Sequence, residues 1–359
     1  MRAVMKTAAE AGFEYSASAP DPTPGRDEVV VKVEAASICG TDVGLYRWSA
    51  SVRAMVPKLP LVVGHEIGGV VVDVGADVSR LAPGDRVALE THIFCSNCAT
   101  CRRGDAHNCE HLRVLGFSWD GGFADFTRVP ESICVRVPES VSPAGAAMLE
   151  PFGVAVHALQ RGGLEQIAGA AVLIVGCGPI GLFLGELAVR FGAAKVVGVE
   201  PDGYRRGLLE DIGGAAVAPE EAGADGFCEA IGVPDGFDLG FEVSGARRTL
   251  SLLLDRVRRE GTVVTVGQLN EPVSIDVTQY INHKGLQLRG VFGRRIWGTW
   301  DLALKLVSEQ GFDPSRLVTH RYALADVDLA MEAVRAGAGK VQLIPGLELG
   351  SAASDPPPA

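Results

Sequence analysis

Long apolar runs are missing from this sequence. The 359 residues are 47% hydrophobic, yet no apolar stretch reaches the roughly 18 residues that a membrane-spanning helix needs. The N-terminal stretch from Met1 to Lys6 begins a strand pattern and has no charged region followed by an apolar one, as a secretory signal would. The sequence therefore predicts neither a membrane span nor a signal peptide.

Positive charge is also scarce. Lys and Arg number 33 against 44 Asp and Glu, which gives a net charge of −11. An acidic surface repels phosphate backbones and anionic lipids, so we expect no nucleic acid and no membrane as partners. The 45 glycines fall at turns without a collagen period, and we find no internal repeat. The length is sufficient for two domains with separate cores.

Cysteines are few but concentrated. Of eight in the chain, four lie between Cys95 and Cys109. Because no secretory signal is recognised, this crowding favours a metal over disulfides and indicates a reducing, cytoplasmic setting. Four thiolates can close a tetrahedron around one structural zinc ion, with ligands Cys95, Cys98, Cys101 and Cys109. The alternatives are metal-free cysteines on a loop and an iron–sulfur cluster, whose usual spacings differ.

Short strands and turns dominate residues 1–137 and predict a partly closed β-barrel. Within them, Asp120-Gly121-Gly122 is typical of a hairpin turn. Cys39 alone would be interpreted as a small buried apolar residue. It becomes a candidate site residue because His65 and Glu66 stand beside glycines further along the chain.

A helical pattern follows over residues 141–162 and contains Glu150. A glutamate near a helix start is often only a favourable charge at the positive end of the helix dipole. Glu150 therefore has two interpretations at this stage, one structural and one functional.

The centre of the chain has the pattern of a dinucleotide site. An apolar strand at 171–175 runs into Gly176-x-Gly178-x-x-Gly181, and a helix is predicted over 180–191. Glycines let backbone N–H groups approach a pyrophosphate, and the helix start offers unpaired N–H groups to it. Strands and helices then alternate to about residue 293, which predicts a doubly wound parallel sheet.

Glu200 stands where the second strand of this alternating region ends. An acidic side chain at that position accepts hydrogen bonds from a ribose diol and repels the extra phosphate of NADP. Arg205 and Arg206 follow closely and could bind a phosphate instead. The position of Glu200 at the strand end favours NAD.

Together, Cys39, His65-Glu66, the four-cysteine loop and the central glycine motif resemble the zinc-containing medium-chain alcohol dehydrogenases. The resemblance implies an α/β protein in which a GroES-like, β-rich catalytic domain is interrupted by a doubly wound Rossmann domain. The expected domains are 1–153 with 297–359 for catalysis and 154–296 for NAD. The tail after about 346 is expected to be disordered. The family also implies an active site in the cleft between the domains, and a homotetramer with dimers formed through Rossmann edge strands near Val291.

Several segments are similar to the L-threonine 3-dehydrogenase branch of the family. They include Cys39-Gly40-Thr41-Asp42-Val43, residues 90–95, Glu150 to His157, and Gly290 to Arg294. Polyol dehydrogenases of the sorbitol type share Glu150-Pro151 and His65-Glu66 and remain an alternative. One departure is Gly44, since relatives often place a proton-relay histidine there; we interpret the glycine as opening room and removing a polar group.

The resemblance implies a role for each matching residue. Cys39, His65 and Glu66 would bind a catalytic zinc, and Glu150 would be a ligand or an exchangeable one. His92 would recognise the substrate, and Thr41 would begin a proton path. The residues implied in cofactor contact are Gly176, Gly178, Pro179, Ile180, Gly181, Glu200, Arg205, Val266, Gly267, Gln268, Val291 and Phe292.

These residues predict an NAD-dependent zinc alcohol dehydrogenase. Zinc with three protein ligands and an open position would acidify a substrate hydroxyl, so that hydride could leave for the cofactor. The expected substrate is a small secondary alcohol, either L-threonine, giving 2-amino-3-oxobutanoate, or a related amino alcohol. The alternatives are a polyol, sugar or cyclitol, and, in another class, a non-catalytic dinucleotide-binding protein.

Overall fold

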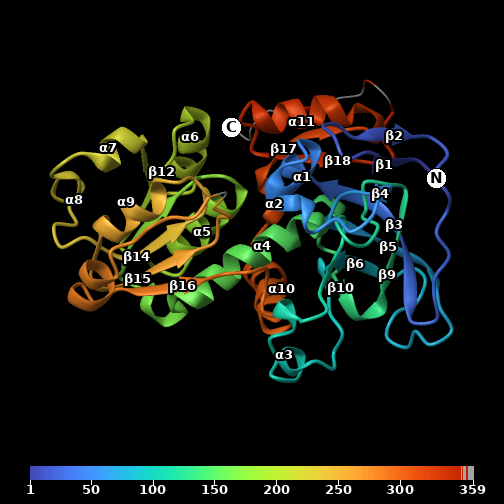
Figure 1. Ribbon diagram of the computed structural model, residues 1–359, viewed down its shortest axis with the longest axis horizontal. Helices are drawn as coiled ribbons and strands as arrows, with labels where there is room; N and C mark the ends of the chain where they lie inside the picture. The colour runs from blue at the N-terminus through green and yellow to red at the C-terminus, as the bar shows by residue number, and fades with distance from the viewer. Residues whose placement is uncertain (270, 349, 351–352, 355–359) are drawn as a thin grey trace. The chain divides into compact units, whose positions relative to one another are not determined.

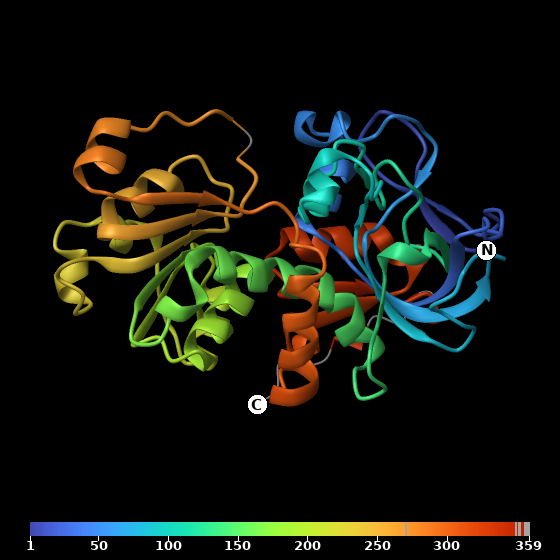
Figure 2. The ribbon, with the colours of Figure 1, turned by 90° about the horizontal axis from the view of Figure 1, so that it is seen from below.

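The computed structural model describes residues 1–269, 271–348, 350 and 353–354. The chain divides into two compact units, one made of Met1–Pro151 with Arg295–Ala359 and the other of Phe152–Arg294. The first crossing between them falls inside helix α4 (Pro143–Gly162). Figures 1 and 2 show a β-rich first unit and a second unit in which helices flank one sheet. The predicted fold class is confirmed.

The first unit is organised around the long strand β3. Its valines Val29, Val31 and Val33 are buried, while Lys32 on the opposite face is exposed, as the two-residue period of a strand requires. β3 pairs antiparallel with β5, β9 and β18. The strands of this unit are β1 (Ala3–Lys6), β2 (Glu14–Ser16), β3 (Glu28–Ser37), β4 (Leu61–Val62), β5 (Glu66–Val74), β6 (Arg86–Leu89), β7 (His92–Ile93), β8 (Arg113–Val114), β9 (Phe126–Pro130), β10 (Cys134–Arg136), β17 (Val318–Tyr322), β18 (Lys340–Leu343) and β19 (Ala353–Ser354).

Apart from α4, which both units share, the described helices of the first unit that precede the return of the chain have at most seven residues. Because β18 pairs with β3, the last part of the chain completes a sheet that the first part begins. The helices are α1 (Gly40–Tyr46), α2 (Ala50–Arg53), α3 (Ala99–Arg102), η1 (Ala106–Asn108), η2 (Glu131–Ile133), α10 (Gly298–Gln310), η5 (Pro314–Leu317), η6 (Leu324–Asp326) and α11 (Val327–Arg335).

The second unit contains a parallel sheet in the order β13-β12-β11-β14-β15-β16 among the described residues. This is the doubly wound order, with the change of direction between β11 and β14. Its strands are β11 (Ala171–Val175), β12 (Lys195–Val199), β13 (Ala215–Val217), β14 (Phe237–Glu242), β15 (Val257–Thr265) and β16 (Gln287–Gly290). Its helices are η3 (Leu164–Gln166), α5 (Pro179–Arg190), α6 (Gly203–Asp211), α7 (Pro219–Gly223), α8 (Phe227–Ala230), α9 (Thr249–Arg256) and η4 (Thr278–His283).

Two local expectations differ from the structure. Asp120-Gly121-Gly122 does not form a hairpin, because β9 pairs with β3 and β8 with β7. Gly121 instead packs so closely that a Cβ would lie 2.1 Å from the carbonyl oxygen of Gly64. In the tail, where we expected disorder, the two residues of β19 pair with β17. Residues 349, 351–352 and 355–359 of the tail lie outside the described part.

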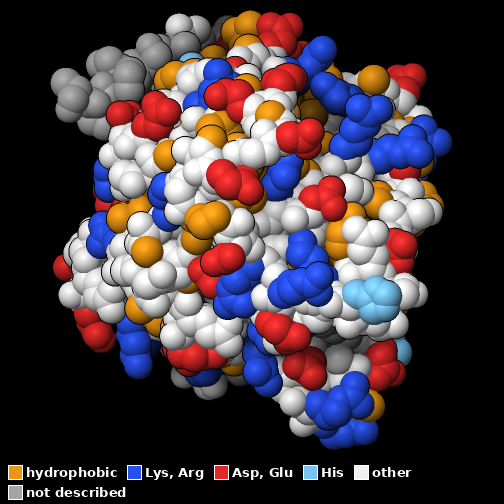
Figure 3. Space-filling view, turned by 90° about the vertical axis from the view of Figure 1, so that its left-hand side faces the viewer, with side chains coloured by type: hydrophobic (Ala, Val, Ile, Leu, Met, Phe, Trp, Pro, Cys, Tyr) orange, Lys and Arg blue, Asp and Glu red, His pale blue; other side chains and the backbone are white. Residues whose placement is uncertain are grey.

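The surface mixes charges of both signs. Figure 3 shows one face, on which acidic and basic side chains are interspersed with hydrophobic ones. None of the described helices combines the length and the hydrophobicity of a membrane-spanning segment.

Candidate metal centres and nucleotide-binding site

Cys39, His65 and Glu66 come together in the first unit, with ligand atoms all within 4.8 Å of one another. Cys39 is the N-cap of α1, and Glu66 is the first residue of β5. The turn just before His65 needs a glycine, because Gly64 has a φ of +93° and a Cβ there would lie 2.2 Å from the Phe123 ring. A thiol, an imidazole and a carboxylate are the donor types that zinc binds in catalytic sites.

Asp42 and Thr41 surround this cluster from α1. The fully buried Asp42 places Oδ1 3.3 Å from Nδ1 of His65, and its Oδ2 accepts the N–H of Cys39 at 2.9 Å. Thr41 Oγ1 lies 3.4 Å from His65 Nε2. Burial opposes charge on His65, but Asp42 and Cys39 raise its pKa well above the ordinary value. The position therefore favours positive charge, which a bound cation would supply.

Glu66 also faces a lysine from the far end of the chain. Lys340 Nζ lies 2.7 Å from Oε1 and 2.5 Å from Oε2 of Glu66, and both side chains are buried. Burial raises the pKa of Glu66 to about 7, although Lys340 acts in the opposite direction. The sequence interpretation missed Lys340. A lysine in the mainly apolar strand predicted at 340–344 could have indicated a buried ion pair.

Glu150 is not in the three-residue group of ligand atoms. It is a buried residue well inside α4, so its interpretation as a helix-start charge is wrong. Its negative charge raises the pKa of both Glu66 and Lys340. Glu150 thus acts on the cluster electrostatically, and its role as a zinc ligand stays a prediction.

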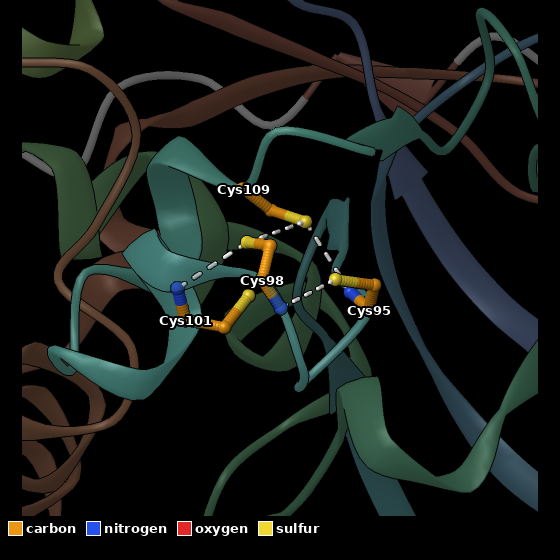
Figure 4. Close-up of side chains that lie close together, drawn as sticks. All are labelled: Cys95, Cys98, Cys101 and Cys109. Atoms are coloured by element: carbon orange, nitrogen blue, oxygen red, sulfur yellow. Dashed lines mark hydrogen bonds between the residues drawn. The ribbon is translucent and has the colours of Figure 1, made fainter.

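The four clustered cysteines have the geometry of a closed zinc site. Their sulfur atoms lie within 4.8 Å of one another and point toward a common centre in Figure 4. Sγ of Cys98 and Sγ of Cys109 are 3.9 Å apart. Two thiolates bound tetrahedrally at about 2.3 Å from zinc would be about 3.8 Å apart, so the cluster fits the metal.

Backbone N–H groups support the sulfur atoms of this cluster. Cys98 donates to Cys95 Sγ at 3.3 Å, and Cys101 donates to Cys98 Sγ at 3.4 Å. N–H donors from Cys101 and Glu110 lower the pKa of Cys98 to about 6. In contrast, burial and neighbouring thiols raise the pKa of Cys101 to about 12. A dication at the centre would stabilise the thiolate form of both.

His92 lies in β7, three residues before the first of these cysteines, and is buried. Its ring is held by Glu90, a neighbour that the sequence interpretation did not single out.

Every residue assigned to the cofactor belongs to the second unit. The glycine turn follows β11, Glu200 follows β12, and two further segments follow β15 and β16. In a parallel sheet these carboxyl ends share one edge, where doubly wound folds bind ligands. The segments after β15 and β16 hold Val266, Gly267, Gln268, Val291 and Phe292.

In the glycine turn, the backbones of Gly176 and Gly181 approach each other closely. Gly176 has a φ of +101°, and a Cβ on Gly181 would lie 1.9 Å from the carbonyl oxygen of Gly176. Gly178 is the N-cap of α5, and Pro179 occupies its first turn, where a missing N–H costs nothing. Ile180 follows in that first turn, so unpaired N–H groups of the helix start face the turn.

Glu200 is turned toward the glycine motif. Its Oε2 accepts the N–H of Cys177 at 2.8 Å, and its Oε1 accepts the N–H of Asp202 at 3.2 Å. Arg206 donates to the carbonyl oxygen of Glu200 at 2.8 Å, while the backbone N–H of Arg205 donates to Asp202. Glu200 therefore links the glycine turn to the end of β12, in addition to carrying a negative charge there.

Glu242, at the end of β14, is a second carboxylate that the sequence interpretation missed. It is fully buried, and its Oε1 accepts N–H groups of Ser244 and Gly245, both at 3.0 Å. A Cβ on Gly176 would lie 2.9 Å from the Ser244 nitrogen. Glu242 thus shapes the loop that packs against the glycine turn.

Gly44 does not open room, and our interpretation of it is corrected here. A Cβ at Gly44 would lie 3.2 Å from Ser49 Oγ and 3.3 Å from Val52 Cγ1. The glycine lets α1 and α2 pack closely, so the place of the missing relay histidine is already filled.

Comparisons with known proteins agree with this geometry. Residues 25–139 match the alcohol dehydrogenase GroES-like domain, and residues 179–309 match the zinc-binding dehydrogenase domain. L-threonine 3-dehydrogenase of Anaeromyxobacter sp. (strain K) is 36% identical over 96% of this chain and 98% of its own.

Solved structures match over the same extent. A zinc-binding dehydrogenase from Sinorhizobium meliloti 1021, bound to NADP, has a TM-score of 0.84 and 31% identity over 96% of this chain and 99% of its own. The 2R,3R-butanediol dehydrogenase of Bacillus subtilis has a TM-score of 0.85 and 25% identity over the same shares. The chain belongs to the zinc-binding alcohol dehydrogenase family and is a zinc-dependent alcohol oxidoreductase.

Proposed function

We propose that the protein oxidises L-threonine to 2-amino-3-oxobutanoate with NAD. The observation that carries this proposal is the group of Cys39 with the buried His65 and Glu66, in a chain similar to L-threonine 3-dehydrogenases over nearly its whole length. When bound there, zinc would lower the pKa of the substrate hydroxyl. Cys39, His65 and Glu66 would hold the metal, Asp42 would orient His65, and Thr41 would hydrogen-bond the substrate oxygen and begin the path by which the hydroxyl proton leaves for solvent.

NAD is the proposed hydride acceptor. The segments at the carboxyl ends of the strands would bind it, and the start of α5 would offer its N–H groups to the pyrophosphate. A buried carboxylate at Glu200 supports NAD, because it would repel a 2′-phosphate. The Sinorhizobium meliloti protein is bound to NADP, so the preference is tested by comparing initial rates with the two cofactors.

A polyol or related diol is the second candidate substrate. The similarity to 2R,3R-butanediol dehydrogenase supports it. The close packing at Gly44 removes one argument for it, since no additional space is opened.

A substrate panel separates the two candidates. The zinc-loaded enzyme is given NAD with L-threonine, L-serine, sorbitol or 2,3-butanediol, and NADH absorbance is followed. Threonine turnover with weak polyol turnover supports the proposal. Turnover of polyols alone would remove the threonine assignment.

We also propose the remaining organisation. The catalytic domain consists of residues 1–153 and 297–359, the NAD domain of 154–296, and the enzyme works in the cytoplasm as a homotetramer. The described edge strand β16 supports dimer formation near Val291, because Leu288 and Phe292 are 39% and 42% exposed. Leu288→Asp should lower the mass of the oligomer in analytical ultracentrifugation, while Leu329→Asp in α11 should leave that mass unchanged.

A further inference from the structure

Two segments assigned to the cofactor leave the parallel sheet on either side of one residue, Glu242. It is the last residue of β14, and its partners in the sheet are Val175 of β11 and Thr265 of β15. The glycine turn follows the first partner directly. The segment that follows the second donates to the carbonyl oxygen of Glu242 through the N–H groups of Val266 at 2.8 Å and Gly267 at 3.0 Å. Glu242 is therefore in contact with a cofactor segment through its backbone alone.

The side chain of Glu242 holds a third segment, the loop of residues 243–246. Oε1 accepts the backbone N–H groups of Ser244 and Gly245, both at 3.0 Å, and the Ser244 hydroxyl at 2.6 Å. The hydroxyl oxygen of Thr249, at the start of α9, lies 2.9 Å from the same atom. Hydrogen bonds to an ionised carboxylate are roughly twice as strong as those between neutral groups. The carboxylate therefore fixes the course of this loop.

Around the other carboxylate oxygen, the backbones pack so closely that they need glycine. Oε2 is buried, has no hydrogen-bond partner among the described residues, and would lie 2.6 Å from a Cβ on Gly267. A Cβ on Gly245 would lie 2.7 Å from the carbonyl oxygen of Gln268, and one on Gly176 would lie 2.9 Å from the Ser244 nitrogen. The loop of residues 243–246 thus contacts the segments after both β11 and β15 through backbone atoms.

These contacts lie where the strand order of the sheet changes direction. The order runs from β11 to β12 and β13 on one side, and from β14 to β15 and β16 on the other. Doubly wound folds bind a dinucleotide across the crevice at this point, with one nucleotide on each half of the sheet. If Glu200, after β12, accepts the adenosine ribose, the nicotinamide nucleotide belongs to the half that begins with β14.

We infer that Glu242 is a positioning residue for the nicotinamide half of the cofactor. It holds the backbone groups of residues 243–246 and 266–268 in place at the crevice. Its own carboxylate is fully buried and does not need to touch the cofactor. Groups that are fixed before binding lose less conformational entropy when the ligand arrives. The inference rests on the proposed function for the role of Glu200, which orients the dinucleotide.

A purely structural role for Glu242 would give a different result on mutation. It would lower the stability of the second unit and weaken every fragment of the cofactor alike. A positioning role weakens a ligand that carries the nicotinamide nucleotide and spares AMP, which occupies only the half of the sheet that holds Glu200. The comparison of NAD with AMP therefore separates the two roles.

The test measures the affinities of the zinc-loaded enzyme for NAD and for AMP by calorimetric titration, in the wild type, Glu242→Gln and Asp313→Asn. Asp313 is the matched control, because one of its oxygens also accepts the N–H and the hydroxyl of the serine two residues later, Ser315, at 2.9 Å and 2.7 Å. Glu242→Gln keeps an acceptor but loses the charge, so the Kd for NAD should rise about tenfold and the Kd for AMP by less than about twofold. Asp313→Asn should change neither value.

A second variant covers the case in which Glu242→Gln does not fold, as thermal unfolding would show. Thr249→Val removes only the hydroxyl beside the carboxylate, and it should raise the Kd for NAD about threefold and leave the Kd for AMP unchanged. Equal losses for NAD and AMP in a folded variant would overturn the inference. An unchanged Kd for NAD in folded Glu242→Gln would overturn it as well.

Failure of the proposed function gives a different result. The titrations contain no alcohol, so an enzyme that oxidises a polyol instead of threonine leaves their outcome unchanged. A preference for NADP would contradict the proposed cofactor. NADP and 2′,5′-ADP then replace NAD and AMP as probes, and Glu242→Gln should still weaken only the ligand that carries nicotinamide.

Discussion

Lys340 and Glu66 form a buried ion pair across 274 residues of sequence, with Nζ 2.7 Å from Oε1. The pair joins β18, at the end of the chain, to the start of β5, which supplies a candidate zinc ligand. The part of the chain that returns to the first unit therefore supplies the cation that faces Glu66, and it also supplies the strand β18 that pairs with β3.

Lys340→Met should destabilise the metal-free protein by about 3–5 kcal/mol, because it leaves a buried carboxylate without its partner. Zinc should reduce this loss, since the cation would itself neutralise Glu66. Denaturant unfolding with and without zinc measures both values. The exposed pair Arg26–Asp77, at 2.6 Å, is the control, and Arg26→Met should cost less than about 1 kcal/mol.

The two metal sites should be separable by mutation. We predict about two zinc ions per chain in the wild type and about one in either Cys39→Ala or Cys98→Ser. Cys39→Ala should lose turnover but keep its fold, whereas Cys98→Ser should lower the melting temperature, because it opens the loop of residues 95–109. Metal analysis measures the zinc content of each variant, and thermal unfolding measures its melting temperature. Cys228→Ala, outside both clusters, should keep both ions; full activity in Cys39→Ala would refute the catalytic assignment.

Glu200 should have two separable roles in cofactor binding. Glu200→Ala removes the acceptor for the Cys177 N–H and the negative charge, so it should weaken NAD binding and reduce discrimination against NADP. Glu200→Gln keeps an acceptor and removes the charge, so it should mainly reduce discrimination. Titration with each cofactor measures the affinities, and an unchanged preference in both variants would contradict this role.

Substitution of Gly44 by alanine should be less favourable for stability than the same substitution at another helical glycine. Gly207→Ala in α6, where a Cβ meets nothing within 4 Å, should stabilise the protein by about 1 kcal/mol through helix propensity. Gly44→Ala should gain less or lose stability, because its Cβ meets Ser49 and Val52. Denaturant unfolding of the two variants compares them. An equal gain at both positions would show that the α1–α2 contact is not tight.

The features that the sequence predicted are local in the chain. Cys95, Cys98, Cys101 and Cys109 lie within one loop, and the glycine motif lies within one turn, so spacing alone indicates their chemistry. Alternating strands and helices likewise predict the parallel sheet. Cys39 and His65-Glu66 lie 26 residues apart, so the sequence marks them as candidates, and the family resemblance assigns them to one zinc site.

The parts that the sequence did not predict depend on distant contacts. Lys340 meets Glu66, and Trp300 meets Glu90, only after the chain returns to the first unit. Gly121 has the local signal of a hairpin, but close packing against Gly64 determines its conformation. Such contacts combine residues that no single window of sequence contains.

The most direct test of the proposed activity is threonine-dependent NADH formation by the zinc-loaded enzyme, measured in parallel for the wild type, Cys39→Ala and Cys228→Ala. We predict that the wild type and Cys228→Ala reduce NAD when L-threonine is added and that Cys39→Ala does not. No threonine-dependent NADH from a wild type carrying both zinc ions would contradict the proposed function.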